Sequence, residues 1–166
     1  MRRIVLIVLT ITLLLWLPVA AVALDVGQQA PEFNLRDLSG KAVSLSDFKG
    51  RIVLLKLATT WCPTCHELSR EISKTGDFLK KNNVVLLEVF IQDAPDKVEH
   101  YIKDFTAPME HYALIDEGQV HEKYRVYMIP RFLVIDPGQA IFFDSLGRNV
   151  TAQDIERLVN EAAAVD

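Results

Sequence analysis

Leu57-Ala58-Thr59-Thr60-Trp61-Cys62-Pro63-Thr64-Cys65-His66-Glu67 contains the only two cysteines of the chain. An apolar run precedes them, and a long segment with helical spacing follows. A Cys-x-x-Cys pair at the junction of a strand and a helix is typical of thiol redox chemistry, but Cys62-Pro-Thr-Cys65-His66 also spells the attachment motif of c-type haem. The rest of the sequence has to decide between these two interpretations.

The first two dozen residues have the composition of an export signal. Arg2 and Arg3 form a charged start, an apolar run follows, and Ala21-Val22-Ala23 matches a small-x-small cleavage site. Residues 4–24 are 21 residues without a charge, and about 20 apolar residues span a bilayer. We therefore expect 1–23 to be either a cleaved signal peptide or an N-terminal membrane anchor.

Both possibilities predict export, to the periplasm or to the outer face of the cytoplasmic membrane, with residues 4–24 as a membrane tether in the second case. Residues 24–166 suit one domain with a sizeable core. They carry 16 basic and 22 acidic residues, a net charge of −6, which argues against a nucleic-acid partner. Two cysteines cannot form a multi-disulfide framework, so a redox or cofactor-binding role is favoured.

Apolar periodicity predicts strands that alternate with helices. The run 51–58 is apolar on both faces, as in a buried parallel strand, and a helix should begin at Cys62 or Pro63. This order predicts an α/β protein of thioredoxin-like fold, with a mixed central sheet flanked by helices and an N-terminal β-hairpin extension. The expected elements are a hairpin at 34–45, a helical turn at 46–50, the strand 51–58, a helix divided near Gly76, a strand at 84–91, a helix from 94, a strand at 112–115, a helix at 117–124, strands at 131–135 and 140–145, and a helix from 151.

Three spaced motifs point to one family. The first comprises Gly27-Gln-Gln-Ala-Pro-Glu-Phe-Asn-Leu35 and Leu45-Ser-Asp-Phe-Lys-Gly50, the second is Thr60-Trp-Cys-Pro-Thr-Cys65, and the third runs from Tyr124 through Ile129-Pro130 to Gly138. In this order they resemble the exported thioredoxin-like proteins of the TlpA/ResA type, which include cytochrome c maturation thioredoxins. The resemblance begins at about Val26 and implies a thiol-disulfide oxidoreductase.

The cysteines and their neighbours are the candidate site. Cys62 is expected at a helix N-terminus, where free N–H groups and the helix dipole favour a thiolate, so we assign it as the nucleophile. Cys65, one turn later, would be the resolving thiol, and the redox-active Cys62–Cys65 disulfide would serve without another cofactor or a metal. The resemblance implies that Pro130 is a cis-proline beside the cysteines and that the Ile129 backbone pairs with the substrate chain. Trp61 would cover the active-site surface, unless it has a role in packing instead.

Three further residues are candidates for tuning the cysteine pKa values. Thioredoxins often carry a buried acid six residues before the first cysteine, and this branch an asparagine, whereas this chain has Lys56. Its ammonium could approach the cysteines and lower the pKa of Cys62, or the side chain could extend to the edge of the sheet. Glu88 could be the missing buried acid or face solvent. His66 could stabilise a thiolate when protonated, or be exposed in the first helical turn.

A c-type haem protein is one competing interpretation. The haem would be attached through the two cysteines, with His66 as axial ligand and Met109 or Met128 as the sixth ligand. The strand before the cysteines and the motif around Ile129-Pro130 would then have no role, which favours redox exchange.

A peroxiredoxin-like thiol peroxidase and a metal-binding module also compete. The usual peroxiredoxin pattern places threonine three residues and proline seven residues before the reactive cysteine. Thr59 matches this pattern, but position 55 is Leu55. A metal site on the two cysteines and His66 would lack a fourth ligand with suitable spacing.

The partners are expected from the resemblance alone. It implies a reductant that acts on exported cysteine-containing proteins or apocytochromes. A membrane electron carrier would then return the cysteines to the dithiol state.

Overall fold

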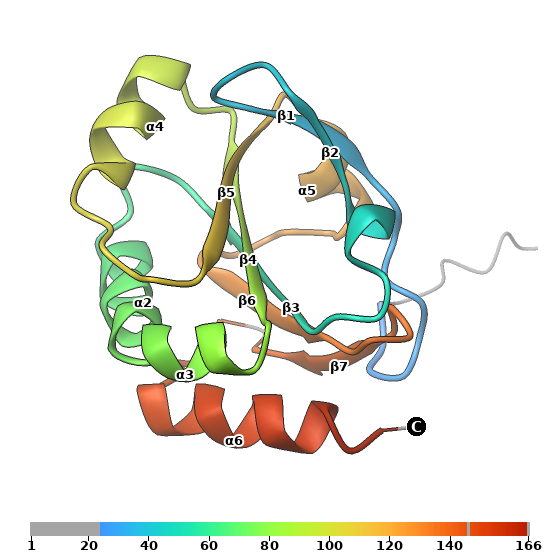
Figure 1. Cartoon of the computed structure of the whole chain (residues 1–166). Coiled ribbons are helices and arrows are strands. Elements are labelled where there is room, and N and C mark those ends of the chain that lie inside the picture. Colours follow the sequence, from blue (N-terminus) through green and yellow to red (C-terminus); the bar gives the residue numbers. More distant parts are fainter. Residues whose placement is uncertain (1–23, 146, 166) are drawn as a thin grey trace, which may run out of the picture.

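Seven strands form one mixed sheet in the computed structural model, which describes residues 24–145 and 147–165 (Figure 1). The strand order is β2-β1-β5-β4-β3-β6-β7. The central strands β3, β4 and β5 run parallel, and the remaining neighbours pair antiparallel. The strands are β1 (Asn34–Asp37), β2 (Ala42–Ser44), β3 (Val53–Ala58), β4 (Val85–Ile91), β5 (Glu110–Asp116), β6 (Arg131–Ile135) and β7 (Ile141–Asp144).

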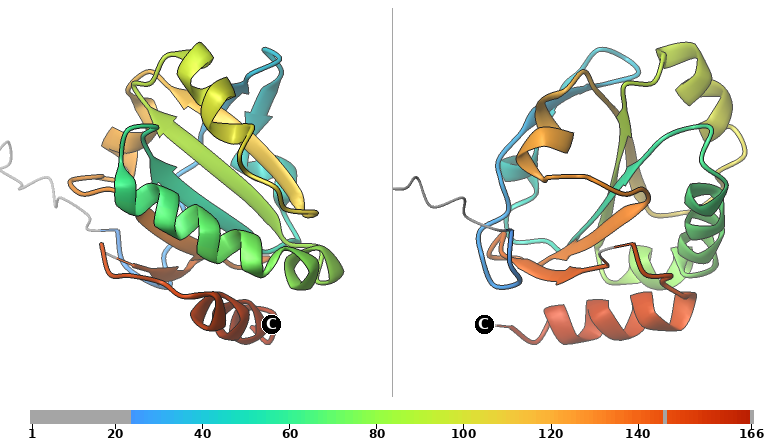
Figure 2. Two further views of the ribbon diagram at one scale, coloured as in Figure 1. Left: turned by 90° about the vertical axis from the view of Figure 1, so that its left-hand side faces the viewer. Right: turned by 180° about the vertical axis from the view of Figure 1, so that it is seen from behind.

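Helices cover both faces of this sheet, so the predicted α/β fold with a mixed central sheet is confirmed (Figures 1 and 2). The α2, α3, α4 and α6 helices lie on one face, whereas η1 and α5 lie on the other. The predicted N-terminal hairpin, β1 and β2, joins the sheet through β5. The helices are η1 (Leu45–Phe48, a 3-10 turn), α2 (Pro63–Lys74), α3 (Gly76–Lys81), α4 (Pro95–Ile102), α5 (Gln119–Lys123) and α6 (Ala152–Ala162).

The alternation of side chains along β3 divides the core into two layers. Leu55 and Leu57 point into the layer under η1 and α5. Leu54 points to the opposite side, into the layer that α2, α3 and α6 cover. Because successive strand residues point to opposite faces, Lys56 lies on the same side as Leu54, at the centre of the sheet.

Several boundaries differ from the sequence prediction by one or two residues, and others agree with it. The strand predicted at 112–115 is longer, because β5 spans seven residues and pairs with β4 along its whole length. The predicted division of the long helix is confirmed, since α2 ends at Lys74 and α3 begins at Gly76. The predicted start of the last helix is also confirmed: Thr151 caps α6 and accepts a hydrogen bond from the Asp154 N–H.

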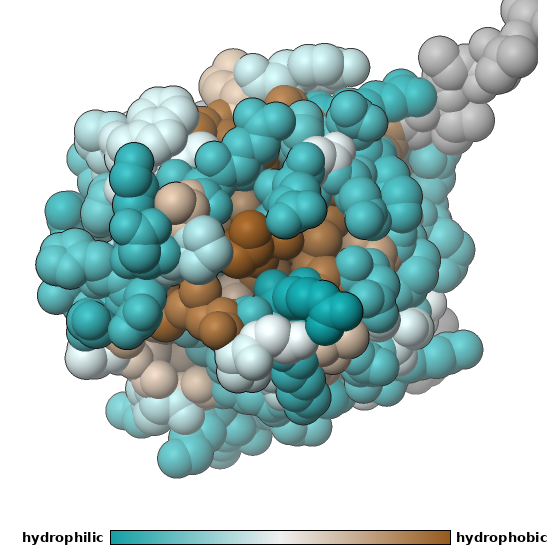
Figure 3. Space-filling model, turned by 90° about the horizontal axis from the view of Figure 1, so that it is seen from above, coloured by the Kyte–Doolittle hydropathy of each residue, from teal (hydrophilic) through white to brown (hydrophobic). Residues whose placement is uncertain are grey.

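The surface seen from above Figure 1 is mostly hydrophilic, with hydrophobic side chains gathered in the middle of that face (Figure 3). Within residues 24–145 and 147–165, none of the helices is both long and apolar enough to cross a membrane. The expected signal peptide or anchor, 1–23, lies outside the described residues and stays a prediction.

Gly76 provides a test of the packing between α3 and the loop before β5. A β-carbon at this position would lie 2.6 Å from Cδ of Pro108. Alanine stabilises a helix by about 1 kcal/mol relative to glycine, but the clash opposes this gain. We expect Gly76→Ala to lower the free energy of unfolding by about 1–3 kcal/mol in urea titrations. Lys80→Ala, at an exposed position of α3, is the control, and a more stable Gly76→Ala variant would contradict the packing argument.

Candidate active site

Cys62 and Cys65 form a disulfide at the start of α2, with their Cα atoms 5.2 Å apart. Cys62 is the N-cap residue, and its Sγ accepts a hydrogen bond from the Cys65 N–H at 3.2 Å. The Thr64 hydroxyl lies 3.3 Å from the same sulfur. Pro63 occupies the first turn, where its missing N–H costs no hydrogen bond. These donors and the helix dipole favour negative charge on Cys62 once the disulfide is reduced.

The segment before Cys62 is held by two side chains from other parts of the chain. The Thr60 N–H and hydroxyl donate to the Asp93 carboxylate at 2.6 and 3.0 Å. His66 donates its Nε2–H to the Thr60 carbonyl at 2.9 Å, and its ring packs on Tyr101 with centroids 4.6 Å apart. His66 is therefore half-buried and hydrogen-bonded, so the expectation of an exposed residue is wrong.

The segment before β6 lies on the other side of the disulfide. The Ile129–Pro130 peptide bond is cis, as the resemblance implies, and Ile129 packs against the buried cluster of Ala58, Cys62 and Cys65. Arg131, which follows Pro130, forms a buried ion pair with Asp144 on β7. Its guanidinium also donates to the backbone carbonyls of Tyr124 and Arg125.

Three large hydrophobic side chains next to the disulfide are exposed. Trp61, beside Cys62, is 72% exposed, so a role in packing is wrong for this residue. Tyr127 and Met128, which precede Ile129, are 92% and 61% exposed. We call these three residues the apolar rim. Isolated exposed hydrophobic residues are common, but three of them on the two segments that flank the disulfide and the cis-proline form a candidate interaction surface.

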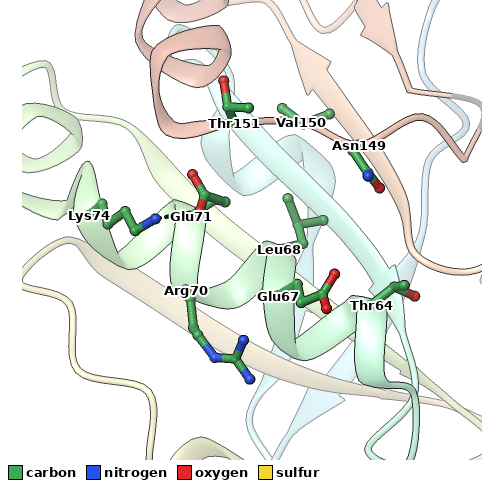
Figure 4. A pocket seen from close by; sticks show the side chains of 9 residues that line it. All are labelled: Thr64, Glu67, Leu68, Arg70, Glu71, Lys74, Asn149, Val150 and Thr151. Carbon is green, nitrogen blue, oxygen red and sulfur yellow. Dashed lines mark hydrogen bonds and ion pairs between the residues drawn. The ribbon is translucent and has the colours of Figure 1, made fainter.

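A polar groove begins at Thr64 and follows α2 (Figure 4). It has a volume of about 370 Å³, and the segment before α6 forms its opposite wall. Glu71 lies inside it and joins the two walls, because its carboxylate accepts from the Ala152 N–H at the start of α6 and from Lys74. The lining residues are Thr64, Glu67, Leu68, Arg70, Glu71, Lys74, Asn149, Val150 and Thr151.

Lys56 and Glu88 form a fully buried ion pair beneath α2. The two residues are direct neighbours in the register of β3 and β4. Lys56 Nζ also donates to the hydroxyls of Ser69, at 2.5 Å, and Tyr101, at 3.0 Å. Its three N–H donors are thus all used. The expectations that Lys56 extends to the sheet edge and that Glu88 faces solvent are both wrong.

The buried network extends in two directions from this ion pair. On one side, the Tyr101 hydroxyl donates to the Cys65 carbonyl at 3.4 Å, and Ser69 and Tyr101 are 2.9 Å apart. On the other side, His111 Nε2 lies 3.2 Å from the second Glu88 oxygen. Burial by itself would raise the pKa of Glu88, but the Lys56 ammonium and His111 outweigh it and lower the pKa to about 2.

Sequence reasoning missed five residues that support the site: Ser69, Asp93, Tyr101, His111 and Arg131. An acid directly after a strand, such as Asp93, is a weak signal by itself, and the other residues gave none.

The fold and the site define a thioredoxin-like protein with a disulfide at a helix N-terminus. The sequence profile of the AhpC/TSA family matches residues 26–143. The chain therefore belongs to this family, and within it to the redoxin-type thiol-disulfide oxidoreductases.

Curated relatives are similar over most of the chain. ResA, a thiol-disulfide oxidoreductase of Geobacillus kaustophilus, is 33% identical over 138 residues, which cover 81% of this chain and 76% of ResA. The thiol:disulfide interchange protein DsbE of Vibrio cholerae is 32% identical over 127 residues, covering 74% of this chain and 65% of DsbE.

Solved structures show the same fold. The thioredoxin domain of a thiol-disulfide oxidoreductase from Bacteroides vulgatus superposes with a TM-score of 0.72 at 22% identity, covering 84% of this chain and 98% of that domain. A thiol:disulfide interchange protein from a Bacteroides species gives a TM-score of 0.71 at 23% identity, covering 84% of this chain and 91% of that one.

The low pKa of Glu88 predicts acid sensitivity. Its ordinary pKa is near 4.5, so the unfolded chain binds a proton at a pH where the folded protein does not. The stabilisation from an ionised Glu88 is complete above pH 4.5 and is lost as the pH falls toward 2. We expect wild type to lose more stability than Lys56→Met/Glu88→Gln between about pH 5 and about pH 2.5, measured by urea midpoints.

Glu161→Gln, which alters an exposed carboxylate of α6, is the control and should follow wild type. The same pH dependence in wild type and in the double variant would contradict an ionised Glu88.

Proposed function

We propose that this chain is an exported thiol-disulfide oxidoreductase that reduces disulfides in envelope proteins through Cys62 and Cys65. The observation that carries the proposal is the position of the disulfide. It caps α2 on one side and contacts Ile129, which precedes the cis-proline, on the other. A thiolate formed there lies next to backbone that an incoming chain can pair with.

The two cysteines differ in accessibility, and this supports their separate roles. Cys62 is 4% exposed and lies at the surface end of the helix, whereas Cys65 is completely buried. In the reduced protein, the Cys62 thiolate attacks a substrate disulfide and forms a mixed disulfide, releasing one substrate thiolate. Cys65 then loses its proton and attacks Cys62, which releases the second substrate thiol. The substrate gains two electrons, and the Cys62–Cys65 disulfide of this structure is the product.

Substrate binding is assigned to the surface around the disulfide. We place an extended segment of the substrate along the Ile129 backbone, in front of Pro130, with its side chains against the apolar rim. Trp61 is exposed, and the backbone of its neighbour Thr60 is fixed by Asp93 and His66. A large aromatic side chain on such a backbone contributes contact area and has few rotatable bonds to immobilise.

Export and the partners rest on the sequence and on the relatives. The composition of 1–23 supports a signal peptide or anchor, and hence the periplasm or the outer face of the cytoplasmic membrane, with a tether through residues 4–24 in the second case. The names of ResA and DsbE describe thiol-disulfide chemistry in those proteins. For this chain we propose exported cysteine-containing proteins, including apocytochromes, as substrates. A membrane electron carrier would return the disulfide to the dithiol.

The competing functions are less well supported by the site. Haem ligation would require His66 to leave its hydrogen bond with Thr60 and its contact with Tyr101. A peroxidase would use Thr59 beside Cys62, but Leu55 packs in the apolar core where the peroxiredoxin pattern has proline. We therefore propose dithiol–disulfide exchange without a further cofactor.

Cysteine variants test the assigned roles. We expect Cys62→Ser to abolish the reduction of insulin disulfides, because the attacking sulfur is lost. Cys65→Ser should retain the first step and accumulate a mixed disulfide with a substrate peptide, detected by mass spectrometry under non-reducing conditions. Unchanged insulin reduction by Cys62→Ser, or rapid peroxide turnover by Cys65→Ser, would contradict the proposal.

Tyr127→Ser tests the apolar rim. The side chain is exposed, so its loss should leave stability and the redox equilibrium of the cysteines unchanged. We expect KM for a disulfide-containing protein substrate to rise about fivefold, corresponding to about 1 kcal/mol of lost contact. Val165→Ser removes an exposed hydrophobic side chain at the C-terminal end and should leave KM unchanged. Equal KM values for both variants would exclude the rim as a docking surface.

A further inference from the structure

The buried ion pair has a fixed orientation relative to the cysteines. Lys56 Nζ contacts the Ser69 hydroxyl, and Ser69 follows Cys65 by four residues, so both lie on one face of α2. Tyr101, which also accepts a hydrogen bond from Lys56, donates to the Cys65 carbonyl. The cationic end of the ion pair therefore lies against the turn of α2 from Cys65 to Ser69, which directly follows the disulfide.

The anionic end points away from that turn. Glu88 lies one strand further along the sheet, on β4, and its second oxygen is bound by His111 on β5. The side chains that contact Lys56 on the helical side, Ser69 and Tyr101, are both neutral hydroxyl groups. The neutral ion pair thus presents its positive end to the cysteines.

We propose that the orientation of the Lys56–Glu88 ion pair stabilises the reduced cysteines and so sets the redox equilibrium of the Cys62–Cys65 disulfide. Lys56 is a positioning and tuning residue that acts through α2 and through its charge. This proposal rests on the proposed function, because it concerns the same cysteines.

The electrons and protons of the redox step show which state the Lys56 charge stabilises. Reduction breaks the Cys62–Cys65 bond and adds two electrons, which a dithiol supplies. Cys65 takes up one proton and stays neutral in the core, while Cys62 remains a thiolate at the helix N-terminus. The reduced state therefore carries one more negative charge than the oxidised state. A nearby cation lowers the free energy of that state, and an anion raises it.

The other ionisable groups near the network do not reproduce this effect. His66 packs on the Tyr101 ring and donates to Thr60, and Asp93 is bound by Thr60 on the surface side of the cysteines. His111 contacts the far oxygen of Glu88. All three residues are retained in the variants below. His66 and Asp93 also keep their partners, whereas His111 loses the Glu88 carboxylate in both double variants.

A stabilising role alone would not explain a buried ion pair at this position. Replacing such a pair by uncharged residues of similar volume is often neutral or favourable for stability, because burying two charges is costly. If the Lys56–Glu88 ion pair had only a structural role, its effect would be the same whether β3 or β4 carried the cation. The direction of the ion pair can therefore be tested separately from its presence.

Two double variants make this test. Lys56→Met/Glu88→Gln removes both charges, and Lys56→Glu/Glu88→Lys reverses the orientation. Two quantities are measured for each folded protein: the pKa of Cys62 from thiolate absorbance, and the equilibrium constant of the disulfide with glutathione. We expect the Cys62 pKa to rise by about one unit in the uncharged variant and further in the reversed one. The equilibrium should shift about tenfold toward the disulfide in the uncharged variant, or about 30 mV, and further in the reversed one.

Several results would overturn the proposal. A reversed variant that resembles wild type in both measurements would show that only the pairing matters. If the reversed variant does not fold, an unchanged Cys62 pKa in the uncharged variant is sufficient to refute the tuning role. Loss of insulin reduction in Cys62→Ser, together with an unchanged equilibrium in both double variants, would leave the proposed function intact and refute this inference alone.

Discussion

The interaction on which the rest of the site depends is the buried ion pair of Lys56 and Glu88. Two charges inside a core are tolerated only when each has its full set of partners. Lys56 obtains them from Glu88, Ser69 and Tyr101, and these side chains come from β4, α2 and α4. The positions of both helices over the sheet are thereby tied to one side chain on β3. Tyr101 also donates to the Cys65 carbonyl, which connects this network to the turn of α2 that follows the disulfide.

Much of the fold could be predicted because local patterns and spaced motifs agree. The run 51–58, the helical spacing after Cys62 and the capping box at Thr151 each specify an element, and the structure contains all three. The extent of β5 could not be predicted in the same way. Its ends depend on pairing with β4, and the sequence of one strand does not contain the register of its neighbour.

The residues that hold the candidate site in place were harder to predict. Lys56 and Glu88 are 32 positions apart, and each alone allowed an exposed side chain. Only the parallel register of β3 and β4 brings them together. Asp93 and His66 likewise acquire a role through contacts with Thr60. The cysteines and Pro130 could be located because a motif identifies them, whereas the residues that hold them are specified by tertiary contacts.

The Cys62–Cys65 couple is proposed to serve as a reductant in an oxidising compartment. The helix N-terminus and Lys56 both stabilise the thiolate, so the couple should be less reducing than an otherwise similar site without them. The most direct measurement is the equilibrium potential of wild type in a series of glutathione buffers. We predict a value more negative than about −220 mV, within or below the range of the biochemically measured cytosolic glutathione poise. A value near about −120 mV, typical of a strong oxidant such as DsbA, would contradict the reductant role and reverse the direction of electron flow.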